Sequence, residues 1–210
     1  MAQIPEPVNG IAQAIDRAYE LEAKGEPLRP HLGASIIGHE CDRYIWLSFR
    51  WAFRPRFPGR VLRLFERGQN EEARVIAWLE RIGVVMRPMG SEQERVSFGW
   101  HFGGSIDGII ESGLPEAPTK QHILEIKTHN KKSFDALASH GVGKAKPMHF
   151  DQMQVYMFGT GIDRALYFAV CKDDDRIYTE RVHLEPDYAQ RLVDLAKSIV
   201  QADRPPEPIS

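Results

Sequence analysis

The stretch that decides the fold is residues 104–128, GSIDGIIESGLPEAPTKQHILEIKT. It contains two short runs rich in isoleucine, GSIDGIIE and QHILEIKT. The residues between them, SGLPEAPTK, are of the types that favour turns. We therefore predict a hairpin of two antiparallel strands. Asp107 would then sit within the first strand and Glu125 within the second, so that the two carboxylates lie on neighbouring strands.

Glu125 and Lys127 are two residues apart, so their side chains lie on the same face of the predicted strand, while Ile126 points into the core. Carboxylates from paired strands, here Asp107 and Glu125, can bind a hard divalent cation, with the carbonyl of Ile126 as a further ligand. A lysine beside such a metal can orient a water, a combination that suits phosphodiester hydrolysis. The same triplet is also typical of an ordinary ion pair on a solvated strand.

The rest of the chain alternates between helical and strand periodicity. Apolar spacing predicts helices over 8–24, 61–82, 133–140, about 150–159 and 186–202, and a short one that carries Cys41, Ile45 and Trp46 on one side. Further strands are predicted at 84–89, 94–99, 164–171 and 176–184, with loops at 51–60 and at the glycine and lysine residues after 140. This order predicts an α/β fold on a mixed sheet. We divide the chain into an N-terminal helix and linker (1–30), one main domain (31–203) and a polar tail (204–210).

Two of the predicted helices carry further candidate residues. Gly68 and Glu72 are one turn apart, and a carboxylate beside a residue without a side chain can approach another element closely. Gln152 and Tyr156 also share a helix face, where an amide can orient a water or a phosphate and a phenol can stack or donate a hydrogen bond. Both patterns also fit ordinary amphipathic helices, with Glu72 on an exposed face.

Together these residues form an ordered set on helix, strand, strand and helix: Gly68-x3-Glu72, Asp107, Glu125-x-Lys127 and Gln152-x3-Tyr156. The set resembles the RecB-type branch of the PD-(D/E)xK nuclease superfamily. The stretch GASIIGHECDRYIWLSFRW, residues 33–51, is similar to the segment that precedes the core in phage exonucleases of the lambda-exonuclease and YqaJ kind. The resemblance covers residues 31–182 and implies a restriction-endonuclease-like core, a mixed central sheet flanked by helices. Ile106 stands where the superfamily name has proline.

The resemblance implies a role for each motif. Asp107 and Glu125 would bind Mg²⁺, with Mn²⁺ as a substitute, and Glu72 would ligate the metal directly or through water. Lys127 would be the catalytic lysine. Support of the site and of the nearby DNA backbone is implied for Gln152 and Tyr156. Ser35 and Arg43 occupy places comparable with the serine and arginine that hold the terminal phosphate of the substrate in that group, although Ser35 also fits a helix cap.

Charge is divided unevenly along the chain. The total, 27 Lys and Arg against 29 Asp and Glu, gives a net charge of −2 and by itself disfavours a nucleic-acid partner. The segment 43–67, however, has seven arginines interleaved with aromatic residues and a single acid, and 127–146 has five lysines and a single acid. Arginines with aromatics are typical of DNA-backbone contacts. The candidate DNA-binding residues are Ser35, Arg43, Arg50, Arg54, Arg56 and Lys131. Alternatively, the aromatics are core residues and the arginines a solvated surface.

Several function classes are excluded by what the sequence lacks. Its two cysteines, Cys41 and Cys171, cannot hold an iron–sulfur cluster of four cysteines or form a disulfide framework. The histidines lack the spacing of a zinc site, and the three aspartates at 173–175 are expected to form a solvated turn. No secretory signal or membrane span is evident, so we expect a cytoplasmic protein.

The resemblance implies a metal-dependent DNA exonuclease that acts on duplex ends with 5′-to-3′ polarity. It further implies phage-type recombination or DNA processing, with a strand-annealing protein as a partner. Two alternatives remain: a structure-selective or nicking endonuclease on the same fold, and a DNA-binding protein without catalysis. The sequence decides neither the oligomeric state nor the number of metal ions.

Overall fold

The computed structural model describes residues 10–88 and 94–208. Its helices are α1 (Gly10–Gly25), α2 (Asp42–Phe49), α3 (Gly59–Arg81), α4 (Lys131–Ala145), α5 (Pro147–Thr160) and α6 (Pro186–Gln201), with a 3-10 turn, η1 (Ala34–Ile36). The strands are β1 (Leu32–Gly33), β2 (Val85–Met86), β3 (Arg95–Ser97), β4 (Phe102–Ser105), β5 (Gly108–Ser112), β6 (His122–His129), β7 (Arg164–Cys171) and β8 (Ile177–His183). The predicted start of the first helix at 8–9, the last residue of the predicted strand 84–89 and residues 209–210 of the tail lie outside the described residues.

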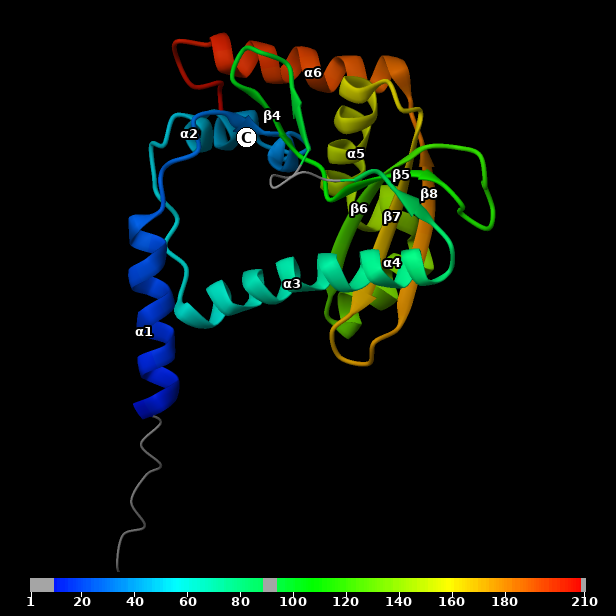
Figure 1. The fold of residues 1–210 in the computed structure, drawn as a ribbon. Coiled ribbons are helices and arrows are strands. Elements are labelled where there is room, and N and C mark those ends of the chain that lie inside the picture. The colour runs from blue at the N-terminus through cyan, green and yellow to red at the C-terminus, as the bar shows by residue number, and fades with distance from the viewer. Residues whose placement is uncertain (1–9, 89–93, 209–210) are drawn as a thin grey trace, which may run out of the picture.

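The strands form two mixed sheets. The larger has the order β2-β5-β6-β7-β8, in which β6 and β7 are parallel and the other pairs antiparallel. The smaller has the order β1-β4-β3, with β1 parallel to β4. The predicted hairpin is present as β5 and β6, which pair Gly108 with Leu124. A mixed sheet flanked by helices is therefore confirmed (Figure 1).

The prediction that Asp107 lies within a strand is wrong. Ile106 still donates its N–H to Glu94 on the side of the small sheet, at 2.9 Å, whereas Gly108 already pairs in the large sheet. The chain therefore changes sheets at Asp107, between β4 and β5. The Asp107 carboxylate accepts a hydrogen bond from the N–H of Ile126, at 2.7 Å. A side chain thus occupies the place where the next backbone bond of the ladder would form.

Alternation along β6 divides the core into two layers. Leu124 and Ile126 pack with Val75 and Leu79 of α3 on one face of the large sheet. Ile123 belongs to the core on the other face, which is covered by residues of α4, α5 and α6. Side chains alternate along a strand, so Glu125 and Lys127 point to the same face as Ile123, which is the face that α5 covers.

The predicted helix end at residue 140 matches a break in α4, but the predicted loop after it holds a second helical segment that reaches Ala145. Gly141 has φ +74° and ψ 168°, a non-helical conformation that side chains rarely adopt, and it interrupts α4. Beyond the kink, the N–H of Val142 donates to the carboxylate of Glu180 at 2.7 Å, so that this turn is capped from β8. The sequence pattern correctly detected the glycine but not the cap that lets the helix resume.

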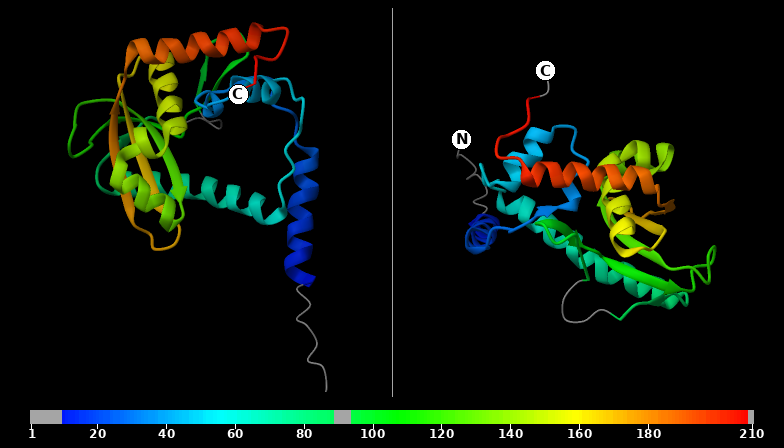
Figure 2. Two further views of the ribbon diagram at one scale, coloured as in Figure 1. Left: turned by 180° about the vertical axis from the view of Figure 1, so that it is seen from behind. Right: turned by 90° about the horizontal axis from the view of Figure 1, so that it is seen from above.

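Helix α1 lies apart from the sheets and rests on the start of α3 (Figures 1 and 2). None of its residues is buried. The N–H of Gly59 donates to Glu20 at 2.9 Å, and a Cβ on Gly59 would come within 2.3 Å of the backbone of Asp16. Arg54 ties the loop before α3 to the carbonyls of Ala23 and Glu26. The predicted boundary at residue 30 stays a prediction.

Replacement of Gly59 by alanine should release α1 without unfolding the core. Overpacking of this kind costs about 1–3 kcal/mol, which raises the detached fraction at least about fivefold. Limited proteolysis should therefore cleave the exposed loop 52–58 faster, while the thermal unfolding midpoint of the main body changes little. Gly25→Ala is the matched control, since a Cβ there meets nothing within 4 Å. Equal cleavage rates in the two variants would mean that α1 does not depend on this contact.

Candidate active site

Glu125 and Lys127 form an ion pair on one face of β6, in which the glutamate is buried and the lysine is partly buried. The side chain of Glu125 is fully buried, and apart from Lys127 neither of its carboxylate oxygens has a hydrogen-bonding partner among the described residues. The Lys127 ammonium also donates to the carbonyl of Ile126 at 3.3 Å. Both groups are therefore held at the end of the hairpin where Asp107 binds the N–H of Ile126.

The carboxylates at this site repel one another. Burial raises the pKa of Glu125 to about 7, with smaller contributions from the charges of Asp107 and Glu72, while Lys127 acts in the opposite direction. Burial likewise raises the pKa of Asp107. Burial alone would lower the pKa of Lys127, but the charges of Glu125 and Asp107 outweigh it and hold that pKa above its usual value. The lysine therefore stays protonated at neutral pH.

Helix α3 brings Glu72 toward Asp107, Glu125 and Lys127, and these four residues are called the acidic cluster below. Burial raises the pKa of Glu72 to about 7, and the charge of Asp107 adds to the effect. One turn earlier, a Cβ on Gly68 would lie 4.0 Å from the hydroxyl of Thr128, so the helix runs close to β6 at this point. Glu72 is partly buried, and the alternative that it merely occupies an exposed face does not hold.

Gln152 and Tyr156 reach the cluster from α5, where both are buried. The amide of Gln152 donates to the hydroxyl of Tyr156 at 3.1 Å. Burial raises the pKa of Tyr156, and the charge of Glu125 is the next cause, so the phenol lies near that carboxylate. A Cβ on Gly104 would come within 2.4 Å of the Tyr156 hydroxyl, which shows how closely β4 approaches α5.

A pocket of about 370 Å³ adjoins Gln152 and Tyr156. Its charged and polar lining includes Arg29, His31, Ser35, Arg95, Gln152 and Tyr156. Burial lowers the pKa of His31, and the positive charges of Arg29 and Arg95 lower it further. The pocket is therefore electropositive. Arg29 can occupy this position because residue 33 is a glycine: a Cβ on Gly33 would lie 2.0 Å from the guanidinium.

Ser35 lines this pocket and is not a helix cap, because the N-cap of η1 is Gly33. Arg43 is not among the lining residues, and its guanidinium instead donates to the carbonyl of Pro206 at 3.1 Å. The sequence did not single out Arg29 or Arg95. These two arginines lie far apart in the chain and meet only through the small sheet, so no local pattern could have identified them.

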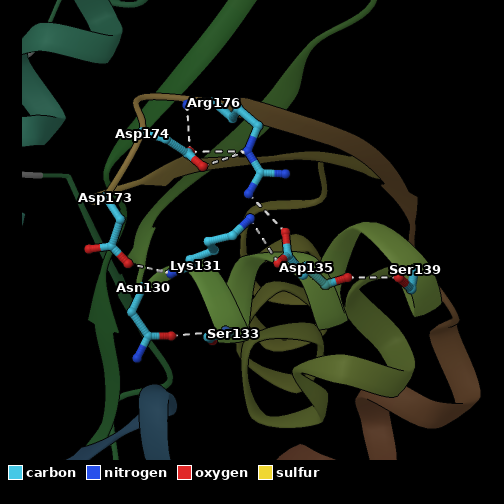
Figure 3. Close-up of polar contacts among 8 residues, drawn as sticks. All are labelled: Asn130, Lys131, Ser133, Asp135, Ser139, Asp173, Asp174 and Arg176. Carbon is cyan, nitrogen blue, oxygen red and sulfur yellow. Dashed lines mark hydrogen bonds and ion pairs between the residues drawn. The ribbon is translucent and has the colours of Figure 1, made fainter.

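Two other arginines proposed to bind DNA also hold the chain together. Arg50 donates to the carbonyls of Val200 and Ala202, at 3.1 and 2.9 Å, and Arg54 to carbonyls at the end of α1. Arg56 is exposed in the loop before α3. Lys131 pairs with Asp135 at 3.3 Å on α4 (Figure 3). The structure therefore brings Ser35 to the pocket but not these basic residues.

The three aspartates after β7 form a turn bound to donors. Asp173 accepts the N–H of Lys131 at 2.7 Å and Asp174 pairs with Arg176 (Figure 3). Asp175 lies 3.3 Å from the guanidinium of Arg74. The sequence interpretation of these residues as a surface turn is therefore correct, and Asp173 also holds the first residue of α4.

The carboxylate cluster fits a hard divalent cation. Across residues 10–88 and 94–208, no group of three His, Cys, Asp or Glu side chains is already gathered as a metal site. Magnesium, however, is commonly held by one or two carboxylates and several waters. Glu125 offers buried oxygens whose one partner among the described residues is Lys127, and Asp107 and Glu72 offer nearby charges whose repulsion a cation would relieve.

A chain of polar side chains lies beside Glu125 on the same face of the sheet. Tyr167 of β7 pairs with Glu125 in the parallel ladder and is fully buried. Its hydroxyl is 2.9 Å from Nε2 of His129 and 2.8 Å from Nδ1 of His149. Burial lowers the pKa of His129 to about 4 and that of His149 to about 3, with nearby lysines adding to both shifts. Both imidazoles are therefore neutral at pH 7.

Ser133 on α4 lies at the outer end of this row of hydrogen-bonded side chains. Its hydroxyl is 3.0 Å from Nδ1 of His129 and accepts a hydrogen bond from Lys146 at 2.7 Å. Its backbone N–H donates to the side chain of Asn130, the N-cap of α4, at 2.9 Å (Figure 3). Two of the histidines, His129 and His149, are thus joined by Tyr167.

Solved structures share this fold. The crystal structure of an alkaline exonuclease, LHK-Exo, from Laribacter hongkongensis matches with a TM-score of 0.58 and 16% identity, over 88% of this chain and 90% of that chain. LHK-Exo in complex with dAMP matches with a TM-score of 0.56 and 15% identity, over 89% and 90%. The crystal structure of SSO0001 matches with a TM-score of 0.51 and 15% identity, over 93% and 88%. Protein-family models and curated protein sequences give no match. The restriction-endonuclease-like fold implied by the motifs is confirmed.

The buried histidine predicts a specific pH dependence of folding. Because the pKa of His129 falls from 6.5 to about 4 on folding, its contribution is complete above pH 6.5 and is lost as the pH falls toward 4. Glu72 and Glu125 act with the opposite sign, since their pKa values rise on folding. The test is therefore the difference between the wild type and His129→Gln. As the pH falls from 6 to 5, the free energy of unfolding of the wild type should fall more steeply than that of His129→Gln, by about 1.4 kcal/mol per pH unit.

This difference can be measured by chemical denaturation in the presence of chelator. His183→Gln is the control, because the side chain of His183 is exposed and its replacement should leave the slope of the wild type unchanged. Parallel profiles for the wild type and His129→Gln would show that His129 is not held neutral in the folded protein.

Proposed function

We propose that this chain is a metal-dependent deoxyribonuclease of the PD-(D/E)xK superfamily that degrades DNA from duplex ends, in the 5′-to-3′ direction. One observation carries the proposal. Tyr156 lines the electropositive pocket, and its hydroxyl lies within electrostatic reach of the buried carboxylate of Glu125. The acidic cluster and the pocket are therefore adjacent, as hydrolysis next to a held strand end requires. The fold shared with an alkaline exonuclease supports this assignment.

The metal ligands in this proposal are Asp107, Glu125 and the carbonyl of Ile126, with Glu72 bound directly or through water. When bound, Mg²⁺ or Mn²⁺ supplies a water of lowered pKa and neutralises charge on the phosphoryl oxygens. The raised pKa of Lys127 keeps its ammonium protonated, so this residue cannot take a proton from the water. Its role is to orient the nucleophile and to stabilise the negative charge that develops at phosphorus. Tyr156 and Gln152 would hold the strand between cluster and pocket.

The pocket would bind the terminal phosphate of the degraded strand. Arg29 and Arg95 supply guanidinium groups, which suit phosphate oxygens, and Ser35 supplies a hydroxyl. The volume of about 370 Å³ is within the range of small-ligand sites. The related fold of LHK-Exo is found in complex with dAMP, a deoxynucleotide. Attack of water on phosphorus would break the bond to the 3′ oxygen, so the released nucleotide would keep its 5′-phosphate and gain a 3′-hydroxyl, and the shortened strand would carry a new 5′-phosphate.

The cellular setting is proposed from the resemblance to phage exonucleases. The chain would act in recombination or DNA processing in the cytoplasm of a bacterial host, together with a strand-annealing protein. The described part of the chain has no helix that is both long and apolar enough to span a bilayer. Because the residues at Arg43, Arg50 and Arg54 are bound to backbone carbonyls, DNA contacts are assigned first to the pocket and only second to the exposed Arg56 and Lys131.

Activity, metal and polarity can be tested together with linear duplexes labelled at a single 5′ or 3′ end. We expect Mg²⁺ to support stepwise release of label from the 5′ end and chelator to abolish it, while closed circles stay intact. Asp107→Asn and Lys127→Met should each lower the rate at least about a hundredfold. Lys197→Met, on the exposed face of α6, is the matched control. Cleavage of closed circles would point instead to an endonuclease, and full activity in both site variants would overturn the assignment.

The pocket predicts a preference for ends that carry a 5′-phosphate. Arg29→Ala and Arg95→Ala should each reduce the ratio of rates on 5′-phosphorylated and 5′-hydroxyl duplexes by about tenfold, because a charge-assisted hydrogen bond is lost. Arg43→Ala tests which arginine binds the terminal phosphate. The sequence resemblance assigns this role to Arg43, whereas the pocket assigns it to Arg29. Loss of the preference in Arg43→Ala alone would refute the pocket as the phosphate site. Initial rates on both duplexes provide the measurement.

A further inference from the structure

The polar chain beside the acidic cluster ends at a ring nitrogen without a partner. His149 lies in the first turn of α5 and uses Nδ1 to contact the hydroxyl of Tyr167, at 2.8 Å. Among the described residues, Nε2 of His149 has no hydrogen-bonding partner. The ring is only partly buried, so this nitrogen is available to a group from outside the chain.

The hydrogen bonds along the chain have a direction. Lys146 can only donate, so the hydroxyl oxygen of Ser133 accepts from it and its proton is free to go to Nδ1 of His129. His129 then carries its proton on Nε2 and donates it to Tyr167, whose own proton goes to Nδ1 of His149. In this arrangement every proton between Lys146 and Nδ1 of His149 has an acceptor. Nε2 of His149 therefore carries an N–H, and the ring presents a neutral donor.

The donor lies close to the proposed site of reaction. Tyr167 is the direct neighbour of Glu125 in the parallel ladder. After burial, the charge of Lys127 is the largest influence on the pKa of His149, so the imidazole lies within electrostatic reach of that ammonium. A group held between His149 and Lys127 would meet one neutral and one positive hydrogen-bond donor. This suits an anionic oxygen, and within a nuclease site that oxygen belongs to a phosphate of the DNA strand.

We propose that Nε2–H of His149 donates a hydrogen bond to a phosphate oxygen of the strand bound beside Lys127, and that Tyr167 and His129 position the imidazole for this contact. The inference rests on the proposed nuclease function and adds a substrate-binding residue to it. A neutral donor suits this place because it binds the phosphate without adding a positive charge that would compete with a cation for the carboxylates. The rigid chain behind it holds the ring in the correct tautomer.

The test compares His149→Ala, His149→Gln, Tyr167→Phe and the double variant His149→Ala/Tyr167→Phe. Steady-state kcat and KM are measured on a 5′-phosphorylated linear duplex with Mg²⁺, and the affinity for Mn²⁺ is measured by calorimetry without DNA. Loss of the donor in His149→Ala should lower kcat/KM by about tenfold to a hundredfold. His149→Gln should stay within about fivefold of the wild type, because its side-chain amide places an N–H near the position of the imidazole Nε2–H.

The double variant distinguishes positioning from general stabilisation. If Tyr167 acts on the substrate only through His149, the double variant should be no slower than His149→Ala, and the affinity for Mn²⁺ should be unchanged in all four proteins. Thermal unfolding shows that each variant is folded. Losses that multiply in the double variant, a glutamine variant as slow as the alanine variant, or weakened Mn²⁺ binding would each overturn the proposal.

The failure of this inference can be told apart from the failure of the proposed function. A wild-type protein that degrades no DNA with Mg²⁺ or Mn²⁺ would overturn the nuclease assignment and this inference with it. An active wild type together with a His149→Ala variant of unchanged kcat/KM would overturn the role of His149 alone.

Discussion

The hydrogen bond from the N–H of Ile126 to the carboxylate of Asp107 joins the two halves of the molecule. On one side of it the chain belongs to the small sheet that carries Arg95 and borders the pocket, and on the other side to the large sheet. The bond replaces a rung of the β5–β6 ladder, so the strand can change sheets without leaving a buried N–H unpaired. It also fixes the Asp107 carboxylate next to Glu125. The position of the pocket relative to the acidic cluster thus follows from one side-chain contact at a strand break.

Sequence reasoning succeeded where the information was local. Glu125 and Lys127 share a face because side chains alternate along a strand, and Gln152 meets Tyr156 because residues four apart adjoin on a helix. It failed where a side chain chooses among distant partners. Arg43 and Arg50 looked like DNA-binding residues, but they bind carbonyls near the C-terminus, and no local pattern distinguishes these two uses of a guanidinium. Arg29 and His149 were missed for the same reason: their neighbours come from elements that only the tertiary fold brings together.

The basic residues have different uses in the structure, and these uses are consistent with the nearly neutral net charge of −2. A nuclease that held DNA through a broad basic surface would need a surplus of Lys and Arg. Here several arginines of the segment 43–67 tie α1 and α6 to the body of the protein, whereas Arg29 and Arg95 line the pocket. A compact positive site recognises one phosphate at a strand end, whereas a long basic surface favours binding along the duplex. The distribution of charge therefore favours a protein that acts on ends.

The acidic cluster lowers the stability of the folded chain, and the proposed metal-binding function would account for its presence. Glu125 is fully buried, and because its pKa rises from 4.5 to about 7 on folding, the free energy of unfolding falls as the pH rises through this interval. Glu72 acts in the same direction, and Lys127 offsets only part of the repulsion because one ammonium faces three carboxylates. A core built for stability alone would place apolar side chains here, as it does at Ile123 and Ala165 on the same face. In the proposed function, a divalent cation bound where the chain changes sheets would reduce the repulsion among these carboxylates and stabilise the folded chain at the same time.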